Sequence, residues 1–234
     1  MDILDLHHWD VTYKEAVEIQ ERLKDRVILK GLGKRIKHIA GLDVSYVKGA
    51  DTVWAGAVVL DFPGLAKTDE RWSQKRVSFP YIPGLLSFRE IPALLNVLRK
   101  LEVEPDLIFC DGQGIAHPRG LGLASHLGVL LNRPTLGCAK TKLVGEFNPV
   151  GERRGDYVYL TYQNKVIGAV VRTRPGVKPV FVSPGYGVLL NECIKFVLET
   201  CSVYRIPEPI RQAHILVNRV RRAVVETEIP FLSV

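Results

Sequence analysis

Apolar residues recur every three to four positions, or alternate with polar ones, along most of the 234-residue chain. The helical spacing predicts helices over residues 11–30, 87–101, 120–132, 187–201 and 208–224. Alternation and short apolar runs predict strands over residues 36–48, 52–62, 70–79, 106–110 and 134–139, and again around a turn at Gln163 within 155–183. Three hairpin-linked strands followed by strand–helix alternation predict an α/β fold, a mixed sheet flanked by helices.

The organisation of the chain favours one domain. We find no internal repeat, low-complexity tract or linker, and a chain of this length buries roughly 70% of its unfolded surface. We therefore expect a single domain over residues 1–234, with an N-terminal helix within 1–33 and a C-terminal helix and tail over 202–234.

Composition excludes several classes of protein. With 47% hydrophobic residues, the chain is too apolar to be disordered. No apolar run approaches the ~20 residues of a membrane span. The acidic N-terminus lacks the basic stretch followed by an apolar stretch that is typical of a signal peptide. Four cysteines show neither a CxxC pair nor zinc-ligand spacing. These features predict reduced thiols, a cytoplasmic location and no membrane partner.

The net charge of +7 points to an anionic partner. Residues 140–178 carry eight lysines and arginines against three acidic residues. A second basic group, Arg219, Arg221 and Arg222, lies near the C-terminus. This charge is either a solvated basic face or a surface that contacts nucleic-acid phosphates.

Two aspartates occupy unusual positions. Asp43 lies inside the predicted strand 36–48, where a carboxylate is costly unless a cation or hydrogen-bond donors satisfy it. Asp111 directly follows strand 106–110, at the kind of strand end where ligands of open α/β sheets bind. Both residues have structural alternatives: Asp43 would be an edge or hydrogen-bonded position, and Asp111 would belong to an ordinary Asp-Gly turn.

Glu90 and His214 lie at the margins of apolar helix faces. Glu90 projects roughly 40° from Leu94, so it either faces a site beside the apolar arc or forms a capping box with Ser87. His214 is either a packed, hydrogen-bonded histidine or a ligand. Three carboxylates and a histidine near buried faces match the donor sets that hold Mg²⁺ beside a phosphate.

Two loops and a lysine add further candidate chemistry. The segment 79–84 (FPYIPG) is stiffened by two prolines and is expected to expose Tyr81 and Ile82, either as a rigid connector or as a wedge that enters a base stack. The glycine-rich loop 112–122 matches neither a Walker loop nor a dinucleotide fingerprint, which argues against a Rossmann enzyme. Its backbone could instead approach a planar base closely. Lys140 is either a surface lysine or a group that stabilises charge on a phosphate.

Four features, in this order along the chain, resemble the endonuclease V family of deoxyinosine-specific repair nucleases. They are GLDVS at 41–45, PYIPGLLSFRE at 80–90, DGQGIAH at 111–117 and Lys140. The resemblance covers most of the chain without a large insertion, and the second and third motifs are specific. It implies an RNase H-like fold, in agreement with the predicted order of strands and helices.

The resemblance also implies a role for each matching residue. Asp43, Glu90 and Asp111 would hold Mg²⁺, for which Mn²⁺ would substitute. His214 would lie near the metal and its attacking water, and Lys140 would steady the scissile phosphate. The wedge would consist of Pro80, Tyr81, Ile82 and Pro83. The pocket for a flipped hypoxanthine would be lined by Leu86, Gly112, His117 and Gly122.

The predicted activity is therefore Mg²⁺-dependent hydrolysis of DNA by a monomer. The family resemblance implies a nick at the second phosphodiester bond 3′ to deoxyinosine, which leaves 3′-hydroxyl and 5′-phosphate ends. One alternative is an inosine-specific endoribonuclease, because the sequence does not show which residues read a 2′-hydroxyl. The other is a non-catalytic module that binds inosine or branched DNA, against which the three carboxylates argue.

Overall fold

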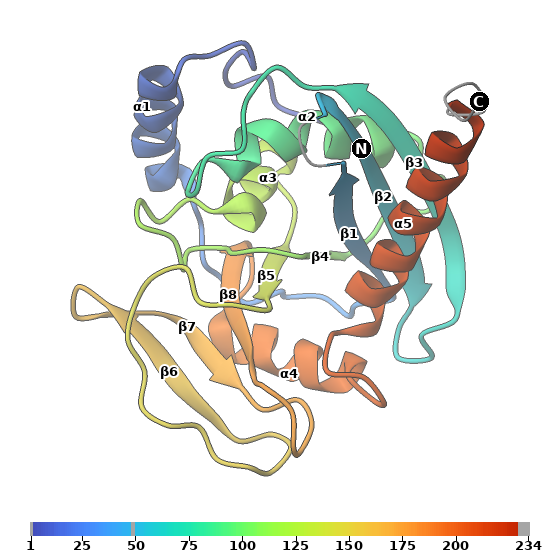
Figure 1. The fold of residues 1–234 in the computed structure, drawn as a ribbon. Helices are drawn as coiled ribbons and strands as arrows, with labels where there is room; N and C mark the ends of the chain where they lie inside the picture. The colour runs from blue at the N-terminus through green and yellow to red at the C-terminus, as the bar shows by residue number, and fades with distance from the viewer. Residues whose placement is uncertain (1, 48–49, 229–234) are drawn as a thin grey trace.

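The computed structural model describes residues 2–47 and 50–228, which form an eight-stranded mixed sheet with helices on both faces (Figure 1). The strands are β1 His38–Tyr46, β2 Thr52–Asp61, β3 Lys67–Arg76, β4 Leu107–Cys110, β5 Thr135–Ala139, β6 Tyr157–Tyr162, β7 Lys165–Val171 and β8 Val180–Tyr186. The helices are α1 Tyr13–Leu23, α2 Leu86–Leu98, α3 Leu123–Leu131, α4 Leu190–Thr200 and α5 Glu208–Glu228, with a 3₁₀ turn at Lys24–Arg26.

The sheet has the order β3-β2-β1-β4-β5-β8-β7-β6. The three predicted N-terminal strands pair antiparallel, and β1, β4 and β5 run parallel, with α3 crossing from β4 to β5. This confirms the predicted mixed sheet. The strands β8, β7 and β6 extend it antiparallel beyond β5. The sequence predicted these last strands but not where they attach, because attachment depends on long-range pairing.

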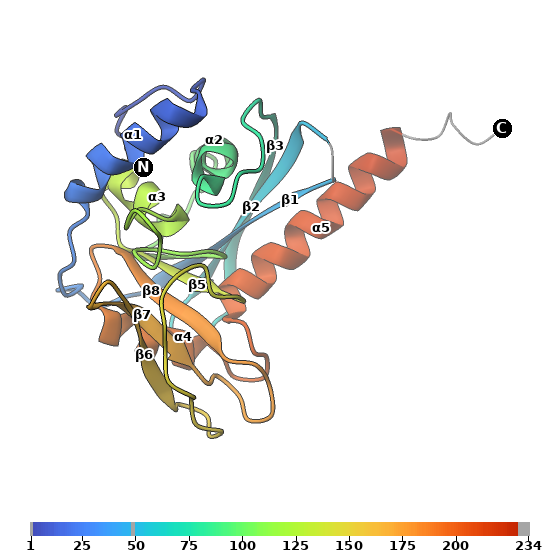
Figure 2. The ribbon, with the colours of Figure 1, turned by 60° about the vertical axis from the view of Figure 1, so that its left-hand side comes forward.

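The alternation of side chains along β1 separates two layers of the core. Ala40 and Leu42 face the cluster that includes α2 and α3, whereas Ile39 faces the cluster that includes α4 and α5. Figure 2 shows this arrangement, with α2 and α3 on one side of the sheet and α5 along the other. Asp43 lies on the same face of β1 as Ile39 and Gly41, the face toward α5, because side chains two residues apart on a strand share a face.

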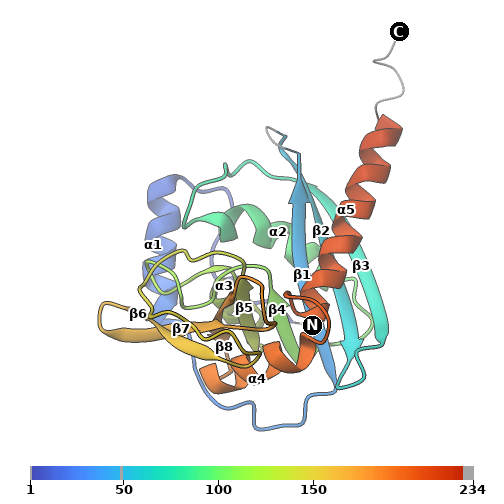
Figure 3. The same ribbon diagram turned by 60° about the horizontal axis from the view of Figure 1, so that its bottom comes forward.

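Two glycines allow α5 to lie directly on the sheet. A Cβ atom at Gly41 would lie 1.9 Å from the carbonyl oxygen of Pro209, and one at Gly56 would lie 2.6 Å from Val217 Cγ1. Gly56 pairs with Asp43 across the β1–β2 ladder. In Figure 3, α5 accordingly crosses β1 and β2 at close range. The glycine of the GLDVS motif thus brings α5 toward the aspartate of the same motif.

The structure differs from the sequence-based element boundaries mainly in the first helix. That helix ends at Leu23 and the 3₁₀ turn, and the chain then runs extended, with the Ile28 carbonyl accepting a hydrogen bond from the Gly187 amide at 2.7 Å. The predicted hairpin turn at Gly49 and the tail beyond Glu228 lie outside the described residues. None of the described helices is long and apolar enough to cross a membrane. All four cysteines are free and buried.

Candidate active site

The parallel pairing of β1 and β4 places two aspartates side by side. Leu42 pairs with Cys110, and the Asp111 amide lies 3.3 Å from the Leu42 carbonyl, so the next residues along both strands are neighbours. Asp43 is therefore central in the sheet, which rules out the edge-strand alternative. His214 of α5 joins them, and one ligand atom of each of Asp43, Asp111 and His214 lies within 4.8 Å of the others.

Glu90 approaches this cluster from α2. It is buried, and burial followed by the negative charges of Asp43 and Asp111 raises the pKa of its carboxyl well above the ordinary value. Among the described residues, none donates a hydrogen bond to this carboxylate. The capping-box alternative is wrong: α2 begins at Leu86 without a side-chain cap, and Ser87 Oγ instead lies 3.1 Å from His126 Nδ1.

His214 is oriented by a chain of polar side chains. Its Nδ1 atom lies 2.7 Å from Asp43 Oδ2, and this hydrogen bond raises the pKa of the imidazole against the effect of burial. On the other side of the ring, Asn218 Nδ2 lies 3.1 Å from Nε2, and Ser45 Oγ donates to Asn218 Oδ1 at 3.1 Å. Neutral His214 with its proton on Nδ1 satisfies every one of these contacts.

Lys140 neutralises part of the charge. Its Nζ atom lies 2.5 Å from Asp111 Oδ2. Burial disfavours the ammonium, but the carboxylates of Asp111 and Asp43 outweigh this effect and raise the pKa of Lys140. For Asp111, burial and the charge of Asp43 raise the pKa, although Lys140 opposes them. The positive charge that opposes the raised pKa of the Glu90 carboxyl is instead that of Arg89.

This donor set fits a hard divalent cation. Asp43 and Asp111 supply the carboxylate oxygens that such ions prefer, and His214 completes the group whose ligand atoms lie within 4.8 Å of one another. Glu90 lies outside that group, but it is near enough for the charges of Asp43 and Asp111 to add to the effect of burial on its carboxyl pKa. Burial, and after it the negative charges of the neighbouring carboxylates, raise the carboxyl pKa values of Glu90 and Asp111, and a bound cation would offset both effects. We therefore assign these residues as the candidate metal-binding residues of the chain.

The raised pKa of the buried Glu90 carboxyl has a measurable consequence for stability. Because the folded protein holds the Glu90 proton more tightly than the unfolded chain does, the stability that this proton provides at low pH is lost as the pH rises through the raised pKa. Glu90→Gln should therefore raise the melting temperature of the metal-free protein at pH 8, by about 2–4 °C for each kcal/mol recovered.

Calorimetry in EDTA checks this expectation, with Glu18→Gln as the matched control, because Glu18 is exposed and pairs only weakly with Lys14 at 3.9 Å. Added Mg²⁺ should then stabilise the wild type more than Glu90→Gln. A lower melting temperature for Glu90→Gln in EDTA would contradict the conclusion that burial and repulsion make the Glu90 carboxylate destabilising.

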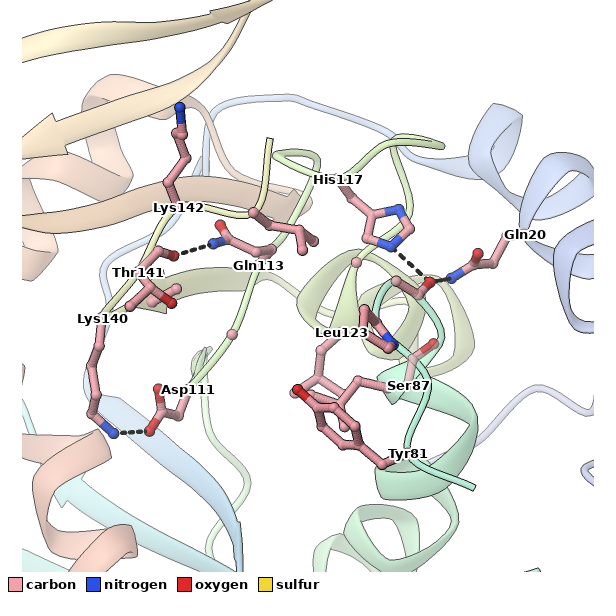
Figure 4. A pocket seen from close by; sticks show the side chains of 17 residues that line it. Gln20, Tyr81, Ser87, Asp111, Gln113, His117, Leu123, Lys140, Thr141 and Lys142 are labelled. Atoms are coloured by element: carbon pink, nitrogen blue, oxygen red, sulfur yellow. Dashed lines mark hydrogen bonds and ion pairs between the residues drawn. The ribbon is translucent and has the colours of Figure 1, made fainter. Parts of the chain in front are cut away.

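A cavity of about 300 Å³ opens beside the carboxylates (Figure 4). Asp111 and Lys140 form one end of its lining, and Tyr81 and His117 lie on other sides of it. The complete lining is Gln20, Tyr81, Pro83, Gly84, Leu86, Ser87, Asp111, Gly112, Gln113, His117, Gly122, Leu123, Ala139, Lys140, Thr141, Lys142 and Leu143. It includes all four residues predicted to form the base pocket.

The predicted wedge is only partly exposed. Tyr81 is 58% exposed and lies at the mouth of the cavity, with Pro80 and Pro83 also exposed. The expectation that Ile82 is exposed is wrong, because its side chain packs against a cluster of buried residues that includes Phe79. Tyr81 is therefore the one aromatic side chain that this segment presents to solvent.

The carbonyl of Gly84 anchors the end of this segment. Gly84 has a φ of +79°, which favours glycine, and its carbonyl oxygen lies 3.1 Å from Gln20 Nε2, 2.9 Å from Arg119 Nη2 and 2.9 Å from His117 Nε2. Burial lowers the pKa of His117 to about 4, so the ring is neutral at pH 7. His117 thus forms a fixed wall of the cavity, with Nε2 donating to Gly84.

The basic segment 140–178 is not one continuous phosphate-binding surface. Arg172 is buried and donates to the carbonyls of Gly151 and Val177, and Arg154 donates to the carbonyl of Leu198. Arg172 therefore links two loops, and Arg154 binds the C-terminal end of α4. The exposed basic side chains of the segment with neither an ion pair nor a hydrogen bond to a carbonyl among the described residues are those of Lys142, Arg153, Lys165 and Lys178.

The comparison with known proteins identifies the chain. The family model described as Endonuclease V matches residues 21–215. The chain belongs to the endonuclease V family. It is 46% identical to the endonuclease V of Myxococcus xanthus over 220 residues, which cover 94% of both chains.

Solved structures of endonuclease V share this fold. The crystal structure of the Streptomyces avermitilis endonuclease V has a TM-score of 0.88 and 43% identity, and the match covers 93% of this chain and 96% of that one. The endonuclease V of Ciona intestinalis, in complex with a 23mer DNA containing an inosine followed by a ribo-adenosine, has a TM-score of 0.82 and 30% identity over 92% of this chain and 100% of that one. The predicted RNase H-like fold is therefore confirmed, and the protein is a nuclease of a metal-dependent family.

In this endonuclease V chain, sequence reasoning missed several residues that shape the site. Gln20 of α1 lines the cavity and donates to the carbonyl of Gly84, which is 64 residues away in the sequence. Gln113 also lines the cavity but was noted only as part of the glycine-rich loop. Asn218 contacts the His214 ring, and Arg205 contacts the backbone of Lys140. A buried glutamine on the apolar face of α1 was a usable signal for Gln20, whereas the other contacts depend on tertiary structure.

Proposed function

We propose that this endonuclease V nicks DNA at the second phosphodiester bond 3′ to deoxyinosine by metal-dependent hydrolysis, and leaves 3′-hydroxyl and 5′-phosphate ends. The observation that carries the proposal is the junction of two features: Asp111 and Lys140 belong both to the carboxylate cluster and to the lining of the cavity. A base held in the cavity would therefore place its own strand across the acidic cluster.

The cavity suits a flipped purine. About 300 Å³, walled by neutral His117 and backed by the backbone of Gly112 and Gly122, accepts a planar base whose edge is read by amide groups. Tyr81 at the mouth would occupy the space that the base leaves and stack on its neighbours. The relative from Ciona intestinalis, crystallised with inosine-containing DNA, supports the same substrate here.

The residues at the acidic end would carry out the hydrolysis. Asp43, Glu90 and Asp111 would hold the cation, which we propose is Mg²⁺, with Mn²⁺ able to substitute. When bound, such an ion lowers the pKa of a water molecule and stabilises negative charge on phosphate oxygens. Lys140 Nζ, next to Asp111, would bind a non-bridging oxygen of the scissile phosphate, and His214, fixed by Asp43, would orient the attacking water.

Inosine-containing RNA is the second candidate substrate. The DNA in the Ciona complex carries a ribo-adenosine directly after the inosine, which favours tolerance of a 2′-hydroxyl at that position in that relative. Side-by-side cleavage of matched DNA and RNA oligonucleotides, each with one inosine, decides between them. We expect faster cleavage of the DNA; faster cleavage of the RNA would make the protein an endoribonuclease.

We further propose that the enzyme acts as a monomer in the cytoplasm. One chain supplies the whole carboxylate cluster and the cavity. Four free, buried cysteines suit a reducing compartment. Light scattering of the active fraction should give the mass of one chain, 26.2 kDa, and a dimeric active fraction would contradict the proposal.

A further inference from the structure

Lys140 lies in a loop segment, directly after β5, whose backbone is held from two sides. Arg205 Nη2 donates to the Lys140 carbonyl at 2.9 Å, and Gln113 Nε2 donates to the Thr141 carbonyl at 3.0 Å. Figure 4 shows the contact from Gln113 alongside the pair of Lys140 and Asp111. Two consecutive carbonyls are thus fixed by side chains from distant parts of the sequence.

We propose that Arg205 and Gln113 are positioning residues that hold the backbone of Lys140 so that its ammonium group reaches the scissile phosphate. The inference rests on the proposed function of Lys140. Neither residue touches the carboxylate cluster. Arg205 does not line the cavity either, so it would act through the lysine alone, whereas Gln113 also lines the cavity.

Arg205 is firmly placed for this task. The same Nη2 atom donates to the Pro179 carbonyl at 2.8 Å, and the Arg205 carbonyl accepts from Thr173 Oγ1 at 2.7 Å. Its Nε atom is buried without a hydrogen-bond partner in the described part of the chain. The hydrogen bonds at both its guanidinium and its carbonyl fix Arg205 beside the Lys140 backbone.

Hydrogen bonds that fix the Lys140 backbone matter because the lysine side chain is flexible. Five side-chain bonds, four of which rotate the ammonium group, separate Lys140 Nζ from its Cα atom, and among the described residues only Asp111 forms an ion pair with it. If the loop moved, the Lys140 ammonium could stay paired with Asp111 but no longer reach the phosphate, or it could lose its ion pair with Asp111. A displacement of about 1 Å at such a group can cost up to about 100-fold in rate.

The test is a double-mutant cycle between Arg205 and Lys140. Single-turnover cleavage of deoxyinosine DNA with Mg²⁺ gives the rate, and DNA affinity without divalent ions gives binding. Arg205→Ala should lower the rate about 10- to 100-fold, leave affinity within about twofold, and be partly rescued by Arg205→Lys. On a Lys140→Ala background, Arg205→Ala should change the residual rate by less than about twofold.

Arg154→Ala is the matched control, because Arg154 also donates to backbone carbonyls but does not contact Lys140. It should leave the rate near that of wild type on both backgrounds. Should Arg205→Ala fail to fold, Arg205→Met, which removes the guanidinium but keeps a long side chain, takes its place in the cycle.

Three outcomes overturn the inference. An unchanged rate for Arg205→Ala would exclude a positioning role. An equal loss on the wild-type and Lys140→Ala backgrounds would assign Arg205 a general structural role. If Lys140→Ala itself cleaves DNA at the normal rate, the proposed role of Lys140 is wrong, and the positioning role of Arg205 and Gln113 is then wrong as well.

Discussion

Replacing Asp111 by asparagine should reduce Mg²⁺-dependent nicking of deoxyinosine DNA by about 1000-fold or more and leave the fold intact. The change removes a carboxylate that lies between Asp43, Glu90 and Lys140. Loss of charge at a metal site weakens an interaction that supplies several kcal/mol to the transition state, and each 1.36 kcal/mol corresponds to a factor of ten. Asp43→Asn should behave in the same way.

Circular dichroism and thermal unfolding serve as the check on folding for Asp111→Asn. Because burial and the charge of Asp43 raise the pKa of Asp111, the variant should be at least as stable as the metal-free wild type. Asp51→Asn is the control for nicking, since Asp51 is an exposed aspartate in the hairpin beyond β1. Near-normal nicking by Asp111→Asn or Asp43→Asn would exclude the carboxylate cluster as the catalytic centre.

The second large effect is expected at the wedge. Tyr81→Ala should weaken binding to deoxyinosine DNA by about 5- to 150-fold, because stacking of a base on an aromatic ring contributes about 1–3 kcal/mol. The rigid setting of Tyr81 strengthens this expectation: the segment ends at Gly84, whose carbonyl accepts hydrogen bonds from three side chains. Tyr81→Phe should retain most of the affinity.

Fluorescence anisotropy on the Asp111→Asn background measures this affinity without interference from cleavage. Tyr13→Ala provides a matched control, since Tyr13 on α1 is 59% exposed and Tyr81 is 58% exposed. The loss should be larger for deoxyinosine DNA than for the same duplex with adenine in its place. Equal affinities of Tyr81→Ala and the parent protein would refute the wedge.

The sequence predicted the strands and helices well because their patterns are local. The apolar arc of α2 and the short apolar strand β4 carry their own signal, and the order of elements restricts the topology. The first helix was placed too long because residues 27–30 are kept extended by a distant contact, from the Gly187 amide to Ile28.

The candidate site was predicted through residues that conflict with their local surroundings. Asp43 in an apolar central strand and Glu90 on a buried helix face are locally unfavourable, and such conflicts are expected at functional sites. Gln113, Arg205 and Asn218 escaped prediction because each is an ordinary polar residue in its own segment. Their importance arises from contacts across 28, 65 and 173 positions of the sequence, which no local pattern records.

The most direct test of the account is to map the nick in a labelled DNA duplex that contains a single deoxyinosine, with and without Mg²⁺. The account predicts one Mg²⁺-dependent nick, at the second phosphodiester bond 3′ to the deoxyinosine, with 3′-hydroxyl and 5′-phosphate ends, and no nick in the matched duplex with adenine. Binding of the deoxyinosine duplex without cleavage under Mg²⁺ or Mn²⁺, or equal cleavage of the two duplexes, would contradict it.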